Sequence, residues 1–331
     1  MNFIPEKYRP INNPWSSSLP DRMSYLPIEM SDTLFLDNVY LQLEMKRFRM
    51  ILGRQRISSG VGYASHFLTL FNKKDIMDPT YEQTGVDAVT IEIPIGLGGN
   101  FTGILQPKDN WNNSTKYLKY KQNIGRFDIS LSYGQKRKVF NYFNHFNFTN
   151  MEYNFIQDMV GVNIVGEFFG IGVWSELGIY NNNFKDSINF VGIHPSYFYE
   201  DKNFNEFVIG LDYTFENSLY VMGEFFHTDF GVTIDQLDFT HYLNYFQSNV
   251  HGLRQNYLFT NVMYPLTDSF TIGVFNIANL DDQSVVFNPQ VQYLLGNNLE
   301  IAFIGSIFYG ENDTEFGTQD YNFRLRLKAY F

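Results

Sequence analysis

The chain ends in Tyr321-Asn322-Phe323-Arg324-Leu325-Arg326-Leu327-Lys328-Ala329-Tyr330-Phe331, and every second residue from Tyr321 to Phe331 is apolar. The residues between them are asparagine, arginine, lysine and tyrosine. Because the side chains of a β-strand alternate between its two faces, this strand has one apolar face and one strongly cationic face. The pattern therefore predicts a strand whose two faces meet different surroundings.

The same alternation recurs along most of the chain. Val89, Ile91 and Ile93 alternate with Thr90 and Glu92, and many other stretches repeat the pattern. We count about fifteen such strands, joined by alternately short and long connections, as in bacterial barrels. A soluble sandwich or propeller also has many short strands, but it does not explain aromatic-rich apolar faces on nearly every strand. The sequence predicts an all-β fold, a transmembrane, antiparallel, up-and-down β-barrel with apolar faces in lipid and polar faces in water.

The expected organisation is one domain with an irregular start. Residues 1–32 are rich in proline, asparagine and serine, which indicates an N-terminal arm or outer loop. Residues 33–331 form the predicted barrel, and its long outer loops are expected at about 58–86, 135–153, 181–203 and 229–253. Because bacterial barrels have an even number of strands, we expect about sixteen in a complete protein that begins upstream of Met1.

Composition agrees with this prediction and excludes other classes. Aromatic residues make up 18% of the chain, with 34 Phe and 23 Tyr, as aromatic girdles at two membrane interfaces require. No apolar run approaches the roughly 18 residues of a membrane-spanning helix. Cysteine is absent, so disulfides and thiolate metal sites are excluded, and the net charge of -11 argues against nucleic-acid binding.

A family resemblance lies within residues 50–95. Gly53-Arg54-Gln55 is followed by Gly60-Val61-Gly62, then by Asp78-Pro79 and Gly85-Val86-Asp87-Ala88. This order resembles a segment of Gram-negative outer-membrane porin-like proteins, in which a GRQ strand end, a glycine-rich loop and a GVDA strand start follow one another. The terminal Phe331, with apolar residues at alternate positions before it, resembles the signal that the barrel-assembly machinery reads.

The resemblance implies a localisation and a function. A protein of this family lies among the lipids of the bacterial outer membrane, catalyses no reaction, needs no cofactor and is compatible with a homo-oligomer. We therefore expect a passive channel for small hydrophilic or charged solutes. The alternative is a structural or adhesive barrel with an occluded lumen, whose long loops bind partners.

Charged residues on the predicted polar faces suggest how such a channel would select solutes. Closure of a barrel brings the last strand beside the first, so a basic stripe is expected near the closure. Its members are Arg324, Arg326, Lys328, Arg47, Arg49 and Arg54. An acidic wall is expected from Glu92, Asp128, Glu176, Asp212, Glu224 and Glu300. Opposed walls produce a transverse field that filters charged solutes, whereas pairing among these residues would only stiffen a filled lumen.

The predicted loop at 58–86 has an apolar centre. Phe67-Leu68-Thr69-Leu70-Phe71 requires burial, which a wholly exposed loop does not offer. The loop can fold into the lumen as a constriction, or it can pack on neighbouring loops or on a second protomer. In the first case Lys73, Lys74, Asp75 and Asp78 would line the opening.

Motifs for catalysis and metal binding are weak. His227-Thr228-Asp229 places a carboxylate two residues from a histidine at an outer strand end, but no nucleophile signature accompanies it. We interpret His227 as an exposed residue of the rim. Gly60-Val61-Gly62 lacks the strand–glycine–helix context of a nucleotide-binding loop. No spaced set of metal ligands is present, so we expect neither a metal site nor catalytic residues.

Overall fold

The computed structural model describes residues 38–64, 68, 70–71, 84–144, 149–183, 203–229, 231, 254–296, 298–311, 314–317 and 321–329. The expected N-terminal arm, most of the loop at 181–203 and nearly all of the loop at 229–253 lie outside these residues. Within the described ranges, no helix is long and apolar enough to cross a membrane.

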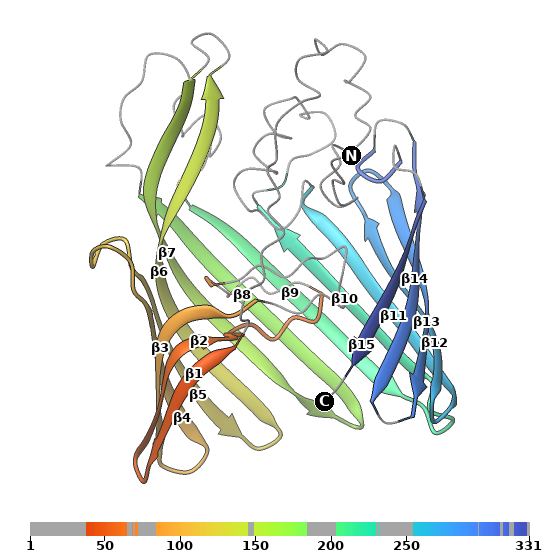
Figure 1. The fold of residues 1–331 in the computed structure, drawn as a ribbon, viewed down its shortest axis with the longest axis horizontal. Coiled ribbons are helices and arrows are strands. Elements are labelled where there is room, and N and C mark those ends of the chain that lie inside the picture. Colours follow the sequence, from red (N-terminus) through yellow and green to blue (C-terminus); the bar gives the residue numbers. More distant parts are fainter. Residues whose placement is uncertain are drawn as a thin grey trace. The chain divides into compact units, whose positions relative to one another are not determined.

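The described residues form one 15-stranded sheet in which each strand is hydrogen-bonded to its sequence neighbours, in the order β1 to β15 (Figure 1). The strands are β1 (Val39–Met45), β2 (Phe48–Gln55), β3 (Val86–Ile95), β4 (Gly99–Gln106), β5 (Thr115–Ile124), β6 (Phe127–Asn144), β7 (Thr149–Phe168), β8 (Ile171–Asn183), β9 (Asn203–Thr214), β10 (Tyr220–Thr228), β11 (Asn256–Thr267), β12 (Phe270–Asn279), β13 (Ser284–Leu295), β14 (Leu299–Tyr309) and β15 (Asn322–Ala329). Pairing is antiparallel, as between β1 and β2, β6 and β7, and β14 and β15. The predicted all-β class and up-and-down order are confirmed.

The chain divides into two compact units. The described residues of the larger unit lie between 38 and 214 and between 222 and 257, and those of the smaller unit lie at 215–221 and between 258 and 329. The larger unit carries the candidate functional site. The smaller unit carries the charged face of β15.

Burial along the strands is reversed relative to a soluble protein. In β9, Phe207, Ile209 and Leu211 are exposed, whereas Glu206 and Val208 between them are buried. In β15 the leucines are exposed and the basic residues are half-buried, so the alternation predicted for this stretch is confirmed from Asn322 to Ala329. We call the two sides of each strand its apolar face and its polar face. Exposing so large an apolar face to water would be unfavourable, so the face is expected to contact other apolar surroundings.

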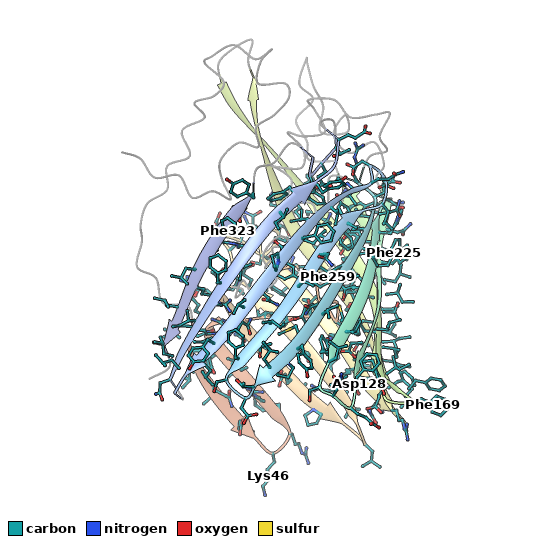
Figure 2. All side chains as sticks on the ribbon, turned by 90° about the vertical axis from the view of Figure 1, so that its right-hand side faces the viewer. Lys46, Asp128, Phe169, Phe225, Phe259 and Phe323 are labelled. Atoms are coloured by element: carbon teal, nitrogen blue, oxygen red, sulfur yellow. The ribbon has the colours of Figure 1, made fainter. Side chains whose placement is uncertain are left out.

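Short turns join the strands at one end of each hairpin. β1 and β2 are joined at Lys46, and β7 and β8 at Phe169-Gly170; Figure 2 shows Lys46 at the end of its turn and Phe169 projecting from the sheet. Phe169 and Gly170 both have positive φ, at 52° and 80°, as the two central residues of a type I′ hairpin turn require. Glycine adopts this conformation freely, whereas Phe169 adopts it at a cost of about 1 kcal/mol.

The predicted loop at 135–153 is wrong. β6 continues to Asn144 and β7 begins at Thr149, so a long hairpin occupies this stretch and runs beyond the ends of its neighbours in Figure 1. The register between the two strands is unbroken from Phe127↔Gly166 to Asn144↔Thr149. Asparagine is common in turns, but here the paired backbone of an antiparallel hairpin outweighs that weak preference.

Candidate functional site

The segment that follows β2 lies on the polar face of the sheet. We call the described residues Arg56–Ala64, Leu68, Leu70 and Phe71 the β2–β3 segment. Its hydrogen bonds reach side chains on β5, β6, β7, β8 and β10, all in the larger unit. One segment therefore contacts the polar faces of five strands.

Two buried carboxylates hold the backbone of this segment. Glu176, on the polar face of β8, accepts hydrogen bonds from the backbone N–H of Val61 at 2.7 Å and of Leu68 at 2.5 Å. Glu224, on the polar face of β10, accepts from the backbone N–H of Tyr63 at 2.5 Å and of Ala64 at 2.8 Å. Both glutamates are 0% exposed. Charge-assisted bonds of this kind compensate the cost of burying the carboxylates.

Glu224 also accepts a hydrogen bond from the indole Nε1 of Trp174 at 2.6 Å. Trp174 is on the polar face of β8, as is Glu176, and is nearly buried. The indole thus orients the carboxylate of Glu224, which accepts the hydrogen bonds of the β2–β3 segment. Through Glu224, the polar faces of β8 and β10 are both linked to this segment.

Cationic and amide side chains hold the carbonyl groups of the same segment. The ammonium of Lys119 on β5 donates to the carbonyl of Ser59 at 2.9 Å, and Asn163 Nδ2 on β7 donates to the same oxygen at 3.3 Å. Lys136 on β6 donates to the carbonyl of Leu70 at 2.5 Å. Carboxylates thus accept hydrogen bonds from the N–H groups of the segment, and ammonium and amide groups donate to its carbonyl groups. These bonds satisfy the polar groups of a buried backbone that is not part of a strand.

Apolar side chains of the segment enter spaces left by glycines. Leu68 and Leu70 are nearly fully buried. A Cβ placed at Gly161 on β7 would lie 2.3 Å from Leu68 Cδ2, and one placed at Gly134 on β6 would lie 2.2 Å from Leu70 Cδ1. Each buried leucine contributes about 1.5–3 kcal/mol to docking of the segment. The surrounding apolar cluster consists of Ile57, Leu68, Leu70, Phe71, Ala88, Ile104, Tyr117, Met159, Tyr180 and Phe204.

The predicted burial of the loop's apolar centre is confirmed for Leu68, Leu70 and Phe71. Phe67 and Thr69 lie outside the described residues, as do Lys73, Lys74, Asp75 and Asp78 of the expected constriction. The role of Glu176 and Glu224 was missed, because backbone N–H groups leave no signal in a sequence. The sequence indicated only that both glutamates lie on polar faces and that the loop has an apolar centre, not that the two are in contact.

The remaining acidic residues of the predicted wall have varied surroundings. Glu92 lies 3.4 Å from Arg49, and Asp128 lies 3.2 Å from Lys121. Asp212 is on the polar face of β9 opposite Gly172, and Glu300 lies 3.0 Å from Arg326. These carboxylates are partly exposed, unlike Glu176 and Glu224.

Arg54 does not belong with Arg49. Register pairs Arg49 with Glu92 on the polar face, whereas Arg54 is opposite Val39 and Asp87 on the apolar face. Arg54 forms a salt bridge of 2.7 Å with Asp87 there. Arg54 lies five positions after Arg49 along β2, an odd step, so the pleat places the two side chains on opposite faces. The assignment of Arg54 to the basic stripe is therefore corrected.

The other members of the predicted stripe divide between a turn and two strands. Arg47 is in the β1–β2 turn and is exposed. Arg324, Arg326 and Lys328 share the half-buried polar face of β15, where Glu300 pairs with Lys328 in the register. That this row meets Arg49 at a closure stays a prediction.

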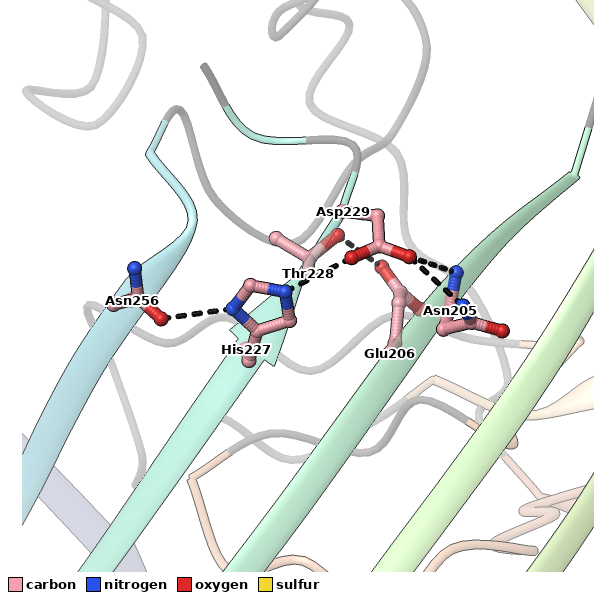
Figure 3. Close-up of polar contacts among 6 residues, drawn as sticks. All are labelled: Asn205, Glu206, His227, Thr228, Asp229 and Asn256. Atoms are coloured by element: carbon pink, nitrogen blue, oxygen red, sulfur yellow. Dashed lines mark hydrogen bonds and ion pairs between the residues drawn. The ribbon is translucent and has the colours of Figure 1, made fainter. Parts of the chain in front are cut away.

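His227 has a carboxylate and an amide as neighbours. Its Nε2 lies 2.9 Å from Asp229 Oδ1, and its Nδ1 lies 2.8 Å from Asn256 Oδ1 (Figure 3). Thr228 points to the other face of β10, where it donates to Glu206. Neither partner of His227 is a hydroxyl or thiol that its imidazole could activate, so the arrangement suits a structural contact. Among the described residues, no group of three or more His, Asp or Glu side chains could hold a metal ion.

Antiparallel strands joined in chain order, each apolar on one face and polar on the other, define the class of up-and-down β proteins that includes transmembrane barrels. No protein-family model matches the chain, and no curated protein matches it. Among solved structures, the chain is similar to an OmpT variant lacking loop L8, an outer-membrane protein of Vibrio cholerae, with a TM-score of 0.47 and 10% identity over 90% of this chain and 80% of that chain. It is also similar to in-vitro folded OmpT of Vibrio cholerae in its trimer form, with a TM-score of 0.42 and 11% identity over 91% and 82% of the two chains.

Proposed function

We propose that this protein is a passive channel of the bacterial outer membrane, through which small hydrophilic or charged solutes diffuse without a reaction or a cofactor. The observation that carries the proposal is the reversed burial of the strands. Leu325 is 67% exposed and Leu211 is 55% exposed, whereas Glu206 and Gln290 are nearly buried. A sheet with this distribution is stable where its apolar face meets hydrocarbon.

The apolar runs have the length that a membrane requires. On β8, the apolar face extends from Ile171 to Ile179: Ile171, Leu177 and Ile179 are exposed, and Val173 and Ser175 between them are half-buried. This run approaches the roughly 9–11 residues that a tilted transmembrane strand needs. With the short turns at the periplasmic ends, as in bacterial barrels, the long connections lie outside the cell.

The β2–β3 segment supports a narrowed lumen. It is bound to polar faces by Glu176, Glu224 and Lys119, so it occupies space that water and solutes would otherwise fill. Selectivity then depends on the partly exposed charges that remain. The basic ones are Arg49, Arg324, Arg326 and Lys328, and the acidic ones are Glu92, Asp128, Asp212 and Glu300. Arg49 pairs with Glu92 and Arg326 pairs with Glu300, so these pairs partly cancel within the set. The charges that such pairs leave uncompensated would then select solutes by their sign.

Assembly partners follow from the same proposal. The lipids of the outer membrane contact the apolar faces, and the barrel-assembly machinery reads the end of the chain at Phe331, which lies outside the described residues. OmpT of Vibrio cholerae has a trimer form, and we propose a homo-oligomer for this chain as well.

Single-channel recording in planar bilayers tests the proposal. The purified protein should produce stable ohmic steps whose size grows with salt concentration. Silence at high protein loading, with folding in vesicles confirmed by resistance to protease, would contradict the channel. Failure to enter the bilayer at all would contradict the membrane assignment itself.

A second candidate is a structural or adhesive barrel with an occluded lumen. The buried apolar cluster under the β2–β3 segment favours it, because Leu68 and Phe71 fill space on a polar face. In that case folded protein would enter the bilayer without conducting. The same protein would bind partners through its long connections.

A further inference from the structure

Polar residues end the apolar face of each strand from β5 to β11. Moving away from the short turns, Leu118 is followed by Lys116, Tyr133 by Gln135, and Val160 by Asp158. On the next strands Ile179 is followed by Asn181, and Phe207 by Asn205 and Asn203. We call this set the polar border; it consists of Lys116, Gln135, Asp158, Asn181, Asn203, Asn205, His227, Asp229 and Asn256, all in the larger unit.

The members of the polar border contact one another from strand to strand. Register places Lys116 opposite Gln135, Gln135 opposite Asp158, and Asp158 opposite Asn181. Lys116 donates to Gln135 at 3.0 Å, and Gln135 donates to Asp158 at 2.9 Å. Asn181 donates to Asn203 at 2.7 Å. The border is therefore a connected polar surface and not a set of isolated side chains.

The connection continues across β9, β10 and β11. Asp229 Oδ2 accepts from the backbone N–H of Asn205 at 2.9 Å and from its side chain at 3.0 Å (Figure 3). Asp229 Oδ1 contacts His227, which contacts Asn256. Figure 3 shows these side chains together at the ends of three neighbouring strands.

Aromatic rings accompany the polar border. Tyr133 donates its hydroxyl to Asp158 at 2.8 Å while its ring belongs to the apolar face. Phe207 stacks on His227 with ring centroids 5.3 Å apart. Trp111, in the connection before β5, is 66% exposed and lies under the ammonium of Lys116. Rings with one apolar side and one polar neighbour are typical of a membrane–water interface.

The chemistry of the border distinguishes sugars from phosphates. Five of its members carry neutral amides, which both donate and accept hydrogen bonds as hydroxyl groups do. Asp158 and Asp229 accept from hydroxyl groups but repel phosphate, and Lys116 is already bonded to Gln135. Exposed aromatic rings beside amides and carboxylates suit the apolar and polar sides of a sugar ring.

We propose that the polar border is where this protein meets the sugar headgroups of glycolipids in the outer leaflet. The border sets the depth of the sheet, with the apolar face below it in hydrocarbon and the extended β6–β7 hairpin above it in water. This inference rests on the proposed membrane location. It goes further because it names a partner and the residues that contact it.

Single cysteines measure the depth without interference, because the chain has no native cysteine. Leu177→Cys, Ile179→Cys and Asn181→Cys on β8 are labelled with an environment-sensitive fluorophore in the folded protein in vesicles. Lipids that carry a quencher deep in their acyl chains should quench the label at 177 most and the label at 181 least. Equal quenching at 177 and 181 would overturn the border. No quenching at any position would instead overturn the membrane location.

Vesicles of phosphatidylcholine with digalactosyldiacylglycerol or with phosphatidylglycerol test the sugar contact. The unfolding temperature of the natural protein should rise with the sugar lipid, and the double variant Asp158→Ala with Asn181→Ala should lose that rise. Gln122→Ala is the matched control, because Gln122 is an amide on the apolar face of β5 at the opposite, turn end. It should keep the rise.

Two results would overturn the sugar contact: an equal rise in the double variant, or a rise with phosphatidylglycerol alone. If the double variant does not fold, Asn205→Ala replaces it and the same outcomes apply. In either case folding into vesicles is measured separately, so a failure to insert is not mistaken for a lost contact.

Discussion

The polar faces of β8 and β10 use their charges differently from the polar face of β15. Glu176 and Glu224 are fully buried and bind backbone N–H groups of a segment distant in sequence. On β15, the side chain of Arg326 is 33% exposed, and it forms an ion pair of 3.0 Å with the carboxylate of Glu300 on the neighbouring strand. The same alternation of residues therefore produces a docking surface in one region and a half-buried row of basic side chains in the other. Among the residues that the structure describes, the β2–β3 segment covers the first of these faces.

Removing a docking carboxylate should have the largest effect. In Glu224→Leu, the N–H groups of Tyr63, Ala64 and Trp174 lose their acceptor, and an apolar side chain that cannot replace it takes its place. Each orphaned buried donor costs about 1–3 kcal/mol, so we expect a loss of about 3 kcal/mol or more. Urea titration of the protein folded in vesicles measures it.

Two controls sharpen this result. Glu224→Gln keeps one acceptor oxygen and should lose less, and Glu167→Leu removes an exposed glutamate of β7 and should change little. If the segment narrows the lumen, Glu224→Leu should also increase single-channel conductance. An unchanged stability would mean that the segment does not depend on this carboxylate.

Placing a charge on the apolar face of β15 should have the next largest effect. Leu325→Arg puts a guanidinium where the side chain is 67% exposed to the surroundings of the sheet. If those surroundings are hydrocarbon, folding should lose about 2–4 kcal/mol. Arg324→Leu on the polar face is the counterpart and should not show that penalty. Equal stability of Leu325→Arg and the natural protein in vesicles would contradict the lipid contact.

Neutralising the row of basic side chains on β15 should change selectivity more than stability. Arg324→Ser with Arg326→Ser removes two cations and leaves Glu300 without the guanidinium that lies 3.0 Å away. A partly exposed ion pair contributes about 0–1 kcal/mol, so folding should be nearly unaffected. The reversal potential in a salt gradient should shift toward cation selectivity. An unchanged potential would place these arginines away from the permeation path.

Most of the strand pattern could be predicted from the sequence, because alternation in β9 or β15 follows directly from the pleat. The docking of the β2–β3 segment could not, since it depends on backbone N–H groups and on the missing Cβ atoms of Gly134 and Gly161. The long β6–β7 hairpin was missed because turn-forming residues were weighed above strand pairing. Arg54 was misplaced because strand parity was outweighed by the grouping of charges.

The smallest effect concerns the pH dependence of the polar border at Asp229. Partial burial raises the pKa of Asp229, but hydrogen bonds from His227 and Asn205 and the charge of His227 outweigh it, so the pKa lies below 3.8. A carboxyl with a lowered pKa stabilises the folded state fully above its unfolded-state value, and this contribution is lost as the pH falls through the lower folded-state value. Asp229→Asn should therefore be less stable than the natural protein at neutral pH, and the difference should shrink as the pH is lowered to about 3. Because both proteins contain His227, the comparison isolates Asp229. A difference in unfolding temperature that stays constant over this range would show that the charge of Asp229 does not stabilise the border.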